Sequence, residues 1–112
     1  MNNLNSMLIE GNIVVEPVLR TENKNICVFT VSSSRFFKNE NEMEEEILQI
    51  DIEAEGGWCR MALEKGKMGA ELRTVGRLKK APDSEKIIIV ADHIEFRPKI
   101  KRSAQKETTK NE

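Results

Sequence analysis

The chain has 112 residues, of which 38% are hydrophobic and 33% are charged, and its formal net charge at pH 7 is -1. This length allows one small domain plus tails, and no apolar run approaches the ~20 residues of a membrane-spanning helix. The N-terminus lacks the pattern of a secretory signal, and two cysteines are too few for a disulfide scaffold. We therefore expect a cytoplasmic protein in which Cys27 and Cys59 are buried thiols.

Charge is distributed unevenly along the chain. Residues 1–56 contain four basic and eleven acidic side chains, a balance of -7, whereas residues 57–112 contain fourteen basic and eight acidic ones, a balance of +6. Such asymmetry is typical of a protein with a polyanionic partner. It also fits a fold in which the two halves interleave and their fields largely cancel. The sequence leaves both interpretations open.

The first predicted element is a long strand. From Met7 to Val15 every second residue is small or apolar, and the polar residues Glu10 and Asn12 lie between them; this period of two is the period of a strand. Gly11, near the middle, predicts a kink. We expect the strand to end at Pro17.

Two further strands are predicted in the first half of the chain. Alternation returns at Cys27 and continues to about Phe37, and the polar segment 38–46 that follows predicts a loop. A third strand covers residues 48–55. One of its faces is predicted to be exposed to solvent, and that face carries Gln49, Asp51, Glu53 and Glu55.

The second half of the chain predicts a short helix and two strands. Residues 58–65 have helical spacing, and Gly66 after them is a typical helix end. A fourth strand is expected over residues 70–80 and a fifth over residues 86–96. After Phe96 the apolar pattern stops, so we expect residues 98–112 to form a disordered basic tail.

Five strands with a short helix between the third and the fourth is the element order of an OB-fold, a partly open Greek-key barrel. We therefore predict an all-β protein with one five-stranded OB-fold domain over residues 1–97. A kink at Gly11 fits this prediction, because tightly bent barrel strands need such positions. Small β-barrels of other kinds remain an alternative.

Several segments resemble the bacterial single-stranded DNA-binding proteins. The segments LIEGNIVVEPVLR, VFTVSSSRFFKN, ALEKGK, GRLKK and IIIVADHIEF occur in the order seen in that family, and together they extend over about residues 4–96. The resemblance implies an OB-fold protein that forms homo-oligomers, tetramers or dimers. It also implies binding and protection of single-stranded DNA without sequence preference, in replication, repair or recombination, and no catalysis and no cofactor.

The resemblance also assigns roles to individual residues. Arg20 matches a family arginine near the DNA path, and Phe37 falls where the family often has a stacking tryptophan. Lys79 and Lys80 match basic residues that lead into the hairpin between the fourth and fifth strands. The chain ends QKETTKNE, whereas the family tail usually ends in acidic residues with a terminal Pro-Phe. Replication or repair proteins are possible partners, but the acidic tail tip by which the family usually recruits them is absent.

The residues themselves predict where bases would stack. Arg35 and Lys38 flank the adjacent rings Phe36 and Phe37, which suits bases stacked beside phosphates. Neighbours in a strand point to opposite faces, so at most one ring reaches the DNA. We expect this to be Phe37, with Phe36 as its packing partner, and the undetermined strand register leaves Phe36 as the alternative stacking ring. Trp58 is expected mainly to pack, with a secondary part in stacking.

A row of cations on the fourth strand predicts a phosphate track, formed by Arg73, Arg77 and Lys79. The alternative is an ordinary solvent-exposed strand face. The candidate nucleic-acid-binding residues are therefore Arg20, Arg35, Phe36, Phe37, Lys38, Trp58, Arg73, Arg77, Lys79 and Lys80.

The sequence predicts no catalytic site, metal site or cofactor site. A nucleophile, a base and an orienting group are not visible together. Asp51, Glu53 and Glu55 could bind a divalent metal, but an exposed strand face explains them more simply. The alternative function is an OB-fold protein–protein adaptor, primosome-like, with weak or no DNA binding, in which the acidic segment 39–46 contacts partner proteins.

Overall fold

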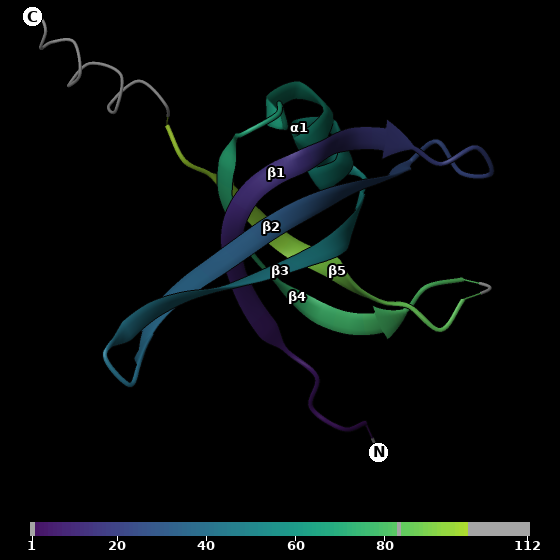
Figure 1. Cartoon of the computed structure of the whole chain (residues 1–112). Coiled ribbons are helices and arrows are strands. Elements are labelled where there is room, and N and C mark those ends of the chain that lie inside the picture. Colours follow the sequence, from purple (N-terminus) through teal and green to yellow (C-terminus); the bar gives the residue numbers. More distant parts are fainter. Residues whose placement is uncertain (1, 83, 99–112) are drawn as a thin grey trace, which may run out of the picture.

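The computed structural model describes residues 2–82 and 84–98. Its strands close into a barrel in the order β1-β2-β3-β5-β4, with one helix between β3 and β4 (Figure 1). This confirms the predicted five-stranded OB-fold architecture. The predicted tail, residues 98–112, lies outside the described residues except for Pro98. In chain order the elements are β1 (Met7–Leu19), β2 (Ile26–Asn39), β3 (Glu42–Glu55), α1 (Gly57–Lys65), β4 (Glu71–Lys80) and β5 (Ile87–Phe96).

Strand β1 changes its partner part-way along its length. Its first part, Met7–Asn12, pairs antiparallel with β4, and the part from Asn12 to Leu19 pairs antiparallel with β2. Gly11 lies at this change of partner, where a Cβ atom would collide with the carbonyl oxygen of Ser32 on β2. Glycine is therefore required here by the close approach of two backbones.

Strand β1 continues past Pro17, so the predicted end of this strand is wrong. The register between β1 and β2 shifts between Val15 and Val18, and Pro17 lies within this irregularity. Proline lacks the N–H group that a regular ladder uses, and an irregular position does not require it. Pairing resumes at Val18, and the strand ends at Leu19.

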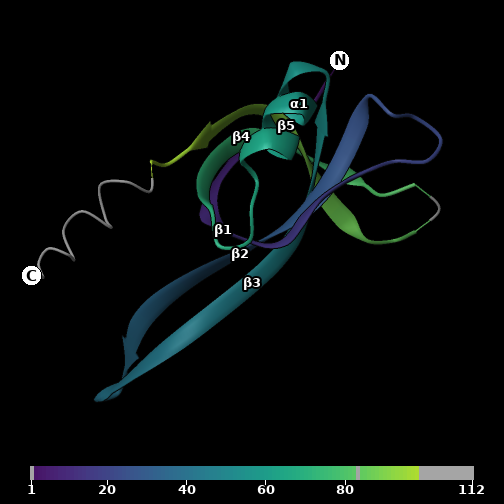
Figure 2. The same ribbon diagram turned by 90° about the horizontal axis from the view of Figure 1, so that it is seen from above.

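The predicted loop over residues 38–46 is also wrong, because β2 and β3 continue through it as one long hairpin. The two strands are joined at Glu40 and Asn41, whose φ angles are 55° and 89°. Two consecutive positive φ angles are typical of a type I′ hairpin turn, a position that asparagine favours. Residues 33–48 form an arm that projects away from the other strands (Figure 2).

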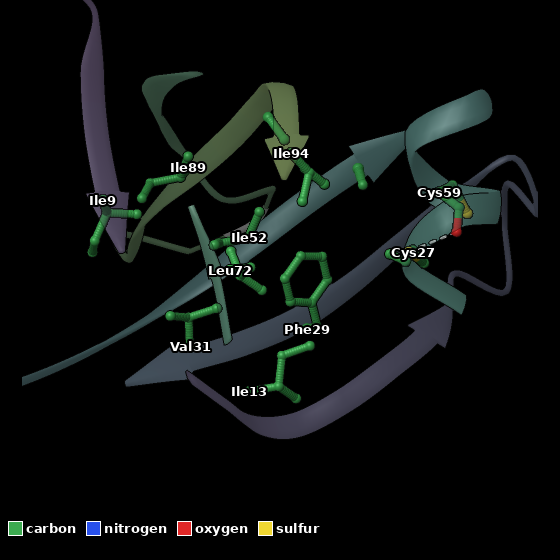
Figure 3. Close-up of a cluster of buried hydrophobic side chains, with 13 residues drawn as sticks. Ile9, Ile13, Cys27, Phe29, Val31, Ile52, Cys59, Leu72, Ile89 and Ile94 are labelled. Atoms are coloured by element: carbon green, nitrogen blue, oxygen red, sulfur yellow. Dashed lines mark hydrogen bonds between the residues drawn. The ribbon is translucent and has the colours of Figure 1, made fainter. Parts of the chain in front are cut away.

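The core lies inside the barrel and receives residues from all five strands and from the helix. Phe29 of β2 is 1% exposed and is surrounded by apolar side chains that include Ile13, Ile52 and Leu72 (Figure 3). Burial of a phenylalanine side chain contributes about 1.5–3 kcal/mol to stability. The predicted core position of Phe29 is confirmed, and Phe96 packs against the same cluster.

Helix α1 confirms the helix predicted over residues 58–65, and it lies at one end of the barrel (Figure 1). It buries Cys59 and Ala62, and it ends at Gly66, whose N–H donates a hydrogen bond of 2.7 Å to the carbonyl oxygen of Ala62. Both cysteines are buried free thiols, as predicted. Among the described residues, no helix has the length and apolar character needed to cross a membrane.

The close approach at Gly11 leads to a stability prediction. We expect Gly11→Ala to lower the free energy of unfolding by about 1–3 kcal/mol, the usual effect of overpacking, because its Cβ atom would force β1 and β2 apart. Gly57→Ala is the control, since the nearest atom to its Cβ position is 3.7 Å away and belongs to the flexible Arg60 side chain. Urea unfolding measures both variants, and an equal stability of the two would contradict this explanation.

Candidate nucleic-acid interface

The outward face of β2 and β3 is the candidate interface. Phe29 and Ile52 point into the core, so their neighbours in sequence point outward. In OB-folds this face, together with the β1–β2 and β4–β5 connections, is the surface that binds oligonucleotides. Both connections leave the barrel on the same side, opposite to the arm (Figure 1). The outward positions on the barrel part of the two strands are Val28, Thr30, Asp51 and Glu53.

Asp51 connects this face to the β4–β5 connection. Thr30 Oγ1 donates a hydrogen bond of 2.7 Å to Asp51 Oδ1, and Lys86 Nζ lies 2.9 Å from Asp51 Oδ2. Burial raises the pKa of Asp51, but the hydrogen bonds from Thr30 and Lys86 and the charge of Lys86 outweigh it, so the pKa is below its usual value. Lys86 was not among the residues predicted from sequence.

Glu53 is buried, although it was predicted to lie on a solvent-exposed strand face. Only 7% of this residue is exposed. Arg20 Nη2 donates a hydrogen bond of 2.9 Å to Glu53 Oε1, and Lys79 Nζ lies 3.5 Å from Glu53 Oε2. Two of the predicted DNA-binding cations are therefore brought together, but they are held by a carboxylate of the protein itself.

The two rings of the arm lie on opposite faces, and their environments differ. Phe36 continues the outward series of Thr30, and 65% of it is exposed, so the prediction that it packs is wrong. Phe37 lies on the other face and is half-buried beneath Arg35, whose guanidinium carbon is 5.0 Å from the ring centroid. This is a cation–π arrangement. Lys38 is exposed on the same face as Phe36.

Acidic side chains of the arm restrict the predicted cations. Arg35 Nη1 lies 3.0 Å from Glu46 Oε1. This ion pair holds the guanidinium over the ring of Phe37. Glu45 is the cross-strand partner of Phe36 and therefore shares its face. A phosphate next to Phe36 would be repelled by Glu45. The feature of the arm that favours nucleic acid is therefore the ring of Phe36 and not the charge beside it.

The cations of β4 alternate outward as predicted, but they differ in their partners. Arg73 Nη2 lies 2.8 Å from Glu10 Oε2 on β1, so its charge is largely neutralised. The hydrogen bond and the charge of Arg73 hold the pKa of Glu10 below its usual value. Arg77 is exposed and has no ion pair within residues 2–82 and 84–98. Lys80 Nζ lies 3.6 Å from the exposed Glu85.

Trp58 belongs to the packing of the helix. It is half-buried against the core, and its ring meets that of His93 edge-on, with centroids 5.0 Å apart and an interplanar angle of 70°. The predicted packing role is in agreement with this position. No contact places the ring on the outward face of β2 and β3 within the described residues.

The described part of the chain holds two buried thiols and no cluster of metal ligands. Within that part, no group of three acidic, histidine or cysteine side chains could hold a metal ion. Burial, together with the hydrogen bond and the charge of Cys59, raises the pKa of the Cys27 thiol to about 12. The thiol of Cys27 is therefore protonated at neutral pH and is not a nucleophile.

Comparisons with known proteins establish the fold. No family model and no curated protein matches the chain. The Plasmodium falciparum SSB in complex with single-stranded DNA is a similar solved structure, with a TM-score of 0.72 and 15% identity over 88% of this chain and 98% of that chain. A small single-stranded DNA-binding protein from Streptomyces coelicolor is also similar, with a TM-score of 0.70 and 19% identity over 87% of this chain and 95% of that chain.

The lowered pKa of Asp51 predicts a pH-dependent contribution to stability. A depressed pKa means that the stabilisation is present above the unfolded value of about 3.9 and is lost as the pH falls through the folded value. We expect Asp51→Asn to lower the free energy of unfolding by about 1 kcal/mol at neutral pH and to have a smaller effect at about pH 3. Urea unfolding at both pH values measures this difference.

Asp92→Asn is the matched control, because Asp92 is exposed and forms no ion pair within the described residues. An equal loss for Asp51→Asn at both pH values would contradict the role assigned to its charge.

Proposed function

We propose that the chain binds single-stranded DNA without sequence preference, through the outward face of β2 and β3. The observation that carries this proposal is the ring of Phe36, which is 65% exposed on that face. Every base has a π-face, so an exposed ring stacks on any base. The proposed stacking residue is therefore Phe36, in place of the Phe37 favoured by sequence.

Cations that point outward supply contacts for the phosphate backbone. Arg77 lies beside Val90 of β5, and Val90 in turn lies beside Glu53 of β3, so Arg77 points outward two strands away from Glu53. Lys38 follows Phe36 on the arm. Both cations are exposed and form no ion pair within the described residues. We assign them the main phosphate contacts, which are independent of base sequence.

The fold supports the same proposal. The solved structure of the Plasmodium falciparum SSB is a complex with single-stranded DNA, and its fold is similar to that of this chain. We place the proposed activity in DNA replication, repair or recombination, where single strands arise, and we propose a homo-oligomer as the active form. Fold alone does not determine function, so the exposed ring and the free cations carry the argument.

A second candidate is an adaptor that binds proteins. The observation that favours it is the set of exposed apolar side chains on both faces of the arm. Met43 and Ile47 on the face of Phe36, and Leu48 on the other face, are each more than half exposed beside four glutamates. An adaptor of this kind would show no binding of oligo-dT at low salt. Titration with oligo-dT at low salt therefore distinguishes the two functions.

We expect Phe36→Ala to weaken binding of a labelled oligo-dT by about 5- to 150-fold, which corresponds to the loss of about 1–3 kcal/mol of stacking. Fluorescence anisotropy at about 50 and 200 mM salt measures the affinity and its salt dependence. Because stacking involves no ion release, the slope of affinity against salt should be unchanged by this substitution.

Leu48→Ala is the matched control, because Leu48 is 52% exposed on the same arm but on the opposite face from Phe36. Equal affinities for Phe36→Ala and Leu48→Ala would contradict the assigned face. Absence of wild-type binding at the lower salt concentration would contradict DNA binding itself.

A further inference from the structure

Glu53 occupies an unusual position for a buried carboxylate, because it points away from the core. The paired residues Ile52 and Phe29 fill the barrel, whereas Glu53 lies in an outward row between Val28 of β2 and Val90 of β5. These two neighbours are half-buried aliphatic side chains. The carboxylate is thus on the proposed DNA-binding face and yet only 7% exposed.

Two cations cover Glu53 and account for its burial. Arg20 follows the end of β1 and Lys79 lies near the end of β4, and their side chains meet over the carboxylate from opposite sides of β3. One oxygen accepts a hydrogen bond from Arg20 at 2.9 Å, and the other lies 3.5 Å from Lys79 Nζ. The carboxylate is therefore shared by two cations, as a bound phosphate would be.

The orientation of Arg20 leaves little of its guanidinium free for another anion. The side chain is 20% exposed, its Nη2 is bonded to Glu53, and its Nη1 lies 3.6 Å from Glu22. Its Nε atom is buried without a hydrogen-bond partner among the described residues. A phosphate can reach this guanidinium only if the guanidinium turns away from Glu53.

We infer that Glu53 is an internal competitor of the DNA backbone, an inference that depends on the proposed function. In the free protein Glu53 occupies Arg20 and Lys79, which would otherwise bind phosphates. A bound strand has to exchange this carboxylate for its own phosphates, so these two cations add little net attraction. Arg77, which has no ion pair within the described residues, makes its full contribution.

The decisive variant is Glu53→Gln, which keeps the shape and one acceptor oxygen of the side chain but removes its charge. We expect it to bind oligo-dT about tenfold more tightly than the wild type at low salt, with a salt slope steeper by about 0.7 for each further phosphate contact. The matched control is Glu55→Gln, two residues later on the same strand face. Glu55 is exposed and has no ion pair within the described residues.

A second comparison does not depend on the folding of the Glu53 variant. In the wild-type background, Lys79→Gln removes a cation that is already paired, whereas Arg77→Gln removes an unpaired cation from the same strand. We expect Lys79→Gln to change the affinity by less than about twofold and Arg77→Gln to lower it by about fivefold. Thermal melting followed by circular dichroism verifies that each variant is folded.

The outcomes separate the inference from the proposed function. If the wild type binds but Glu53→Gln binds no more tightly than Glu55→Gln, the inference is overturned and the function stands. The inference is likewise overturned if Glu53→Gln binds more weakly than the wild type, since Glu53 would then position the cations. Should Glu53→Gln fail to fold, equal losses for Lys79→Gln and Arg77→Gln overturn it. Absence of binding by every protein at low salt overturns both.

Discussion

The ladder between β2 and β3 runs without a register shift from the barrel to the tip of the arm, and it determines the face on which each side chain lies. On the barrel it places Phe29 in the core and Glu53 outside, and on the arm it places Phe36 outward and Phe37 beneath Arg35. A slip of one residue would exchange the two faces. The tight turn at the tip and the apolar core restrain this register from its two ends, so the core and the candidate interface depend on one alignment of strands.

Pairing across the barrel cancels part of the uneven charge of the chain within the described residues. Acidic residues from the first half meet basic residues from the second half. Glu10 is shared by Arg73 and Arg97, and Asp51 pairs with Lys86. Of the two interpretations that the sequence leaves open, interleaving is the one that these contacts support. Attraction for a polyanion therefore depends on cations without such partners rather than on the total charge of either half.

The sequence predicted the fold better than the site, for a physical reason. Period-two alternation and helical spacing are local, and they were sufficient for five strands, one helix and the core position of Phe29. Two predictions failed because a distant segment decides the structure. The irregular ladder with β2 lets β1 continue past Pro17, and pairing between β2 and β3 makes the acidic segment 38–46 part of a hairpin. The burial of Glu53 and the exposure of Phe36 depend on contacts between strands, which no local pattern contains.

A surface with one exposed ring gains little of its binding free energy from stacking. One stacked base contributes about 1–3 kcal/mol, so most of the affinity for a strand has to come from phosphate contacts, which weaken as salt rises. Carboxylates on the same face reduce these contacts, because Glu53 neutralises cations that lie over it and Glu45 lies beside the ring. Under the proposed function, the affinity of the described surface would rest on cations that form no ion pair within the described residues, such as Arg77. Binding through a few phosphate contacts of this kind would be weak and sensitive to salt.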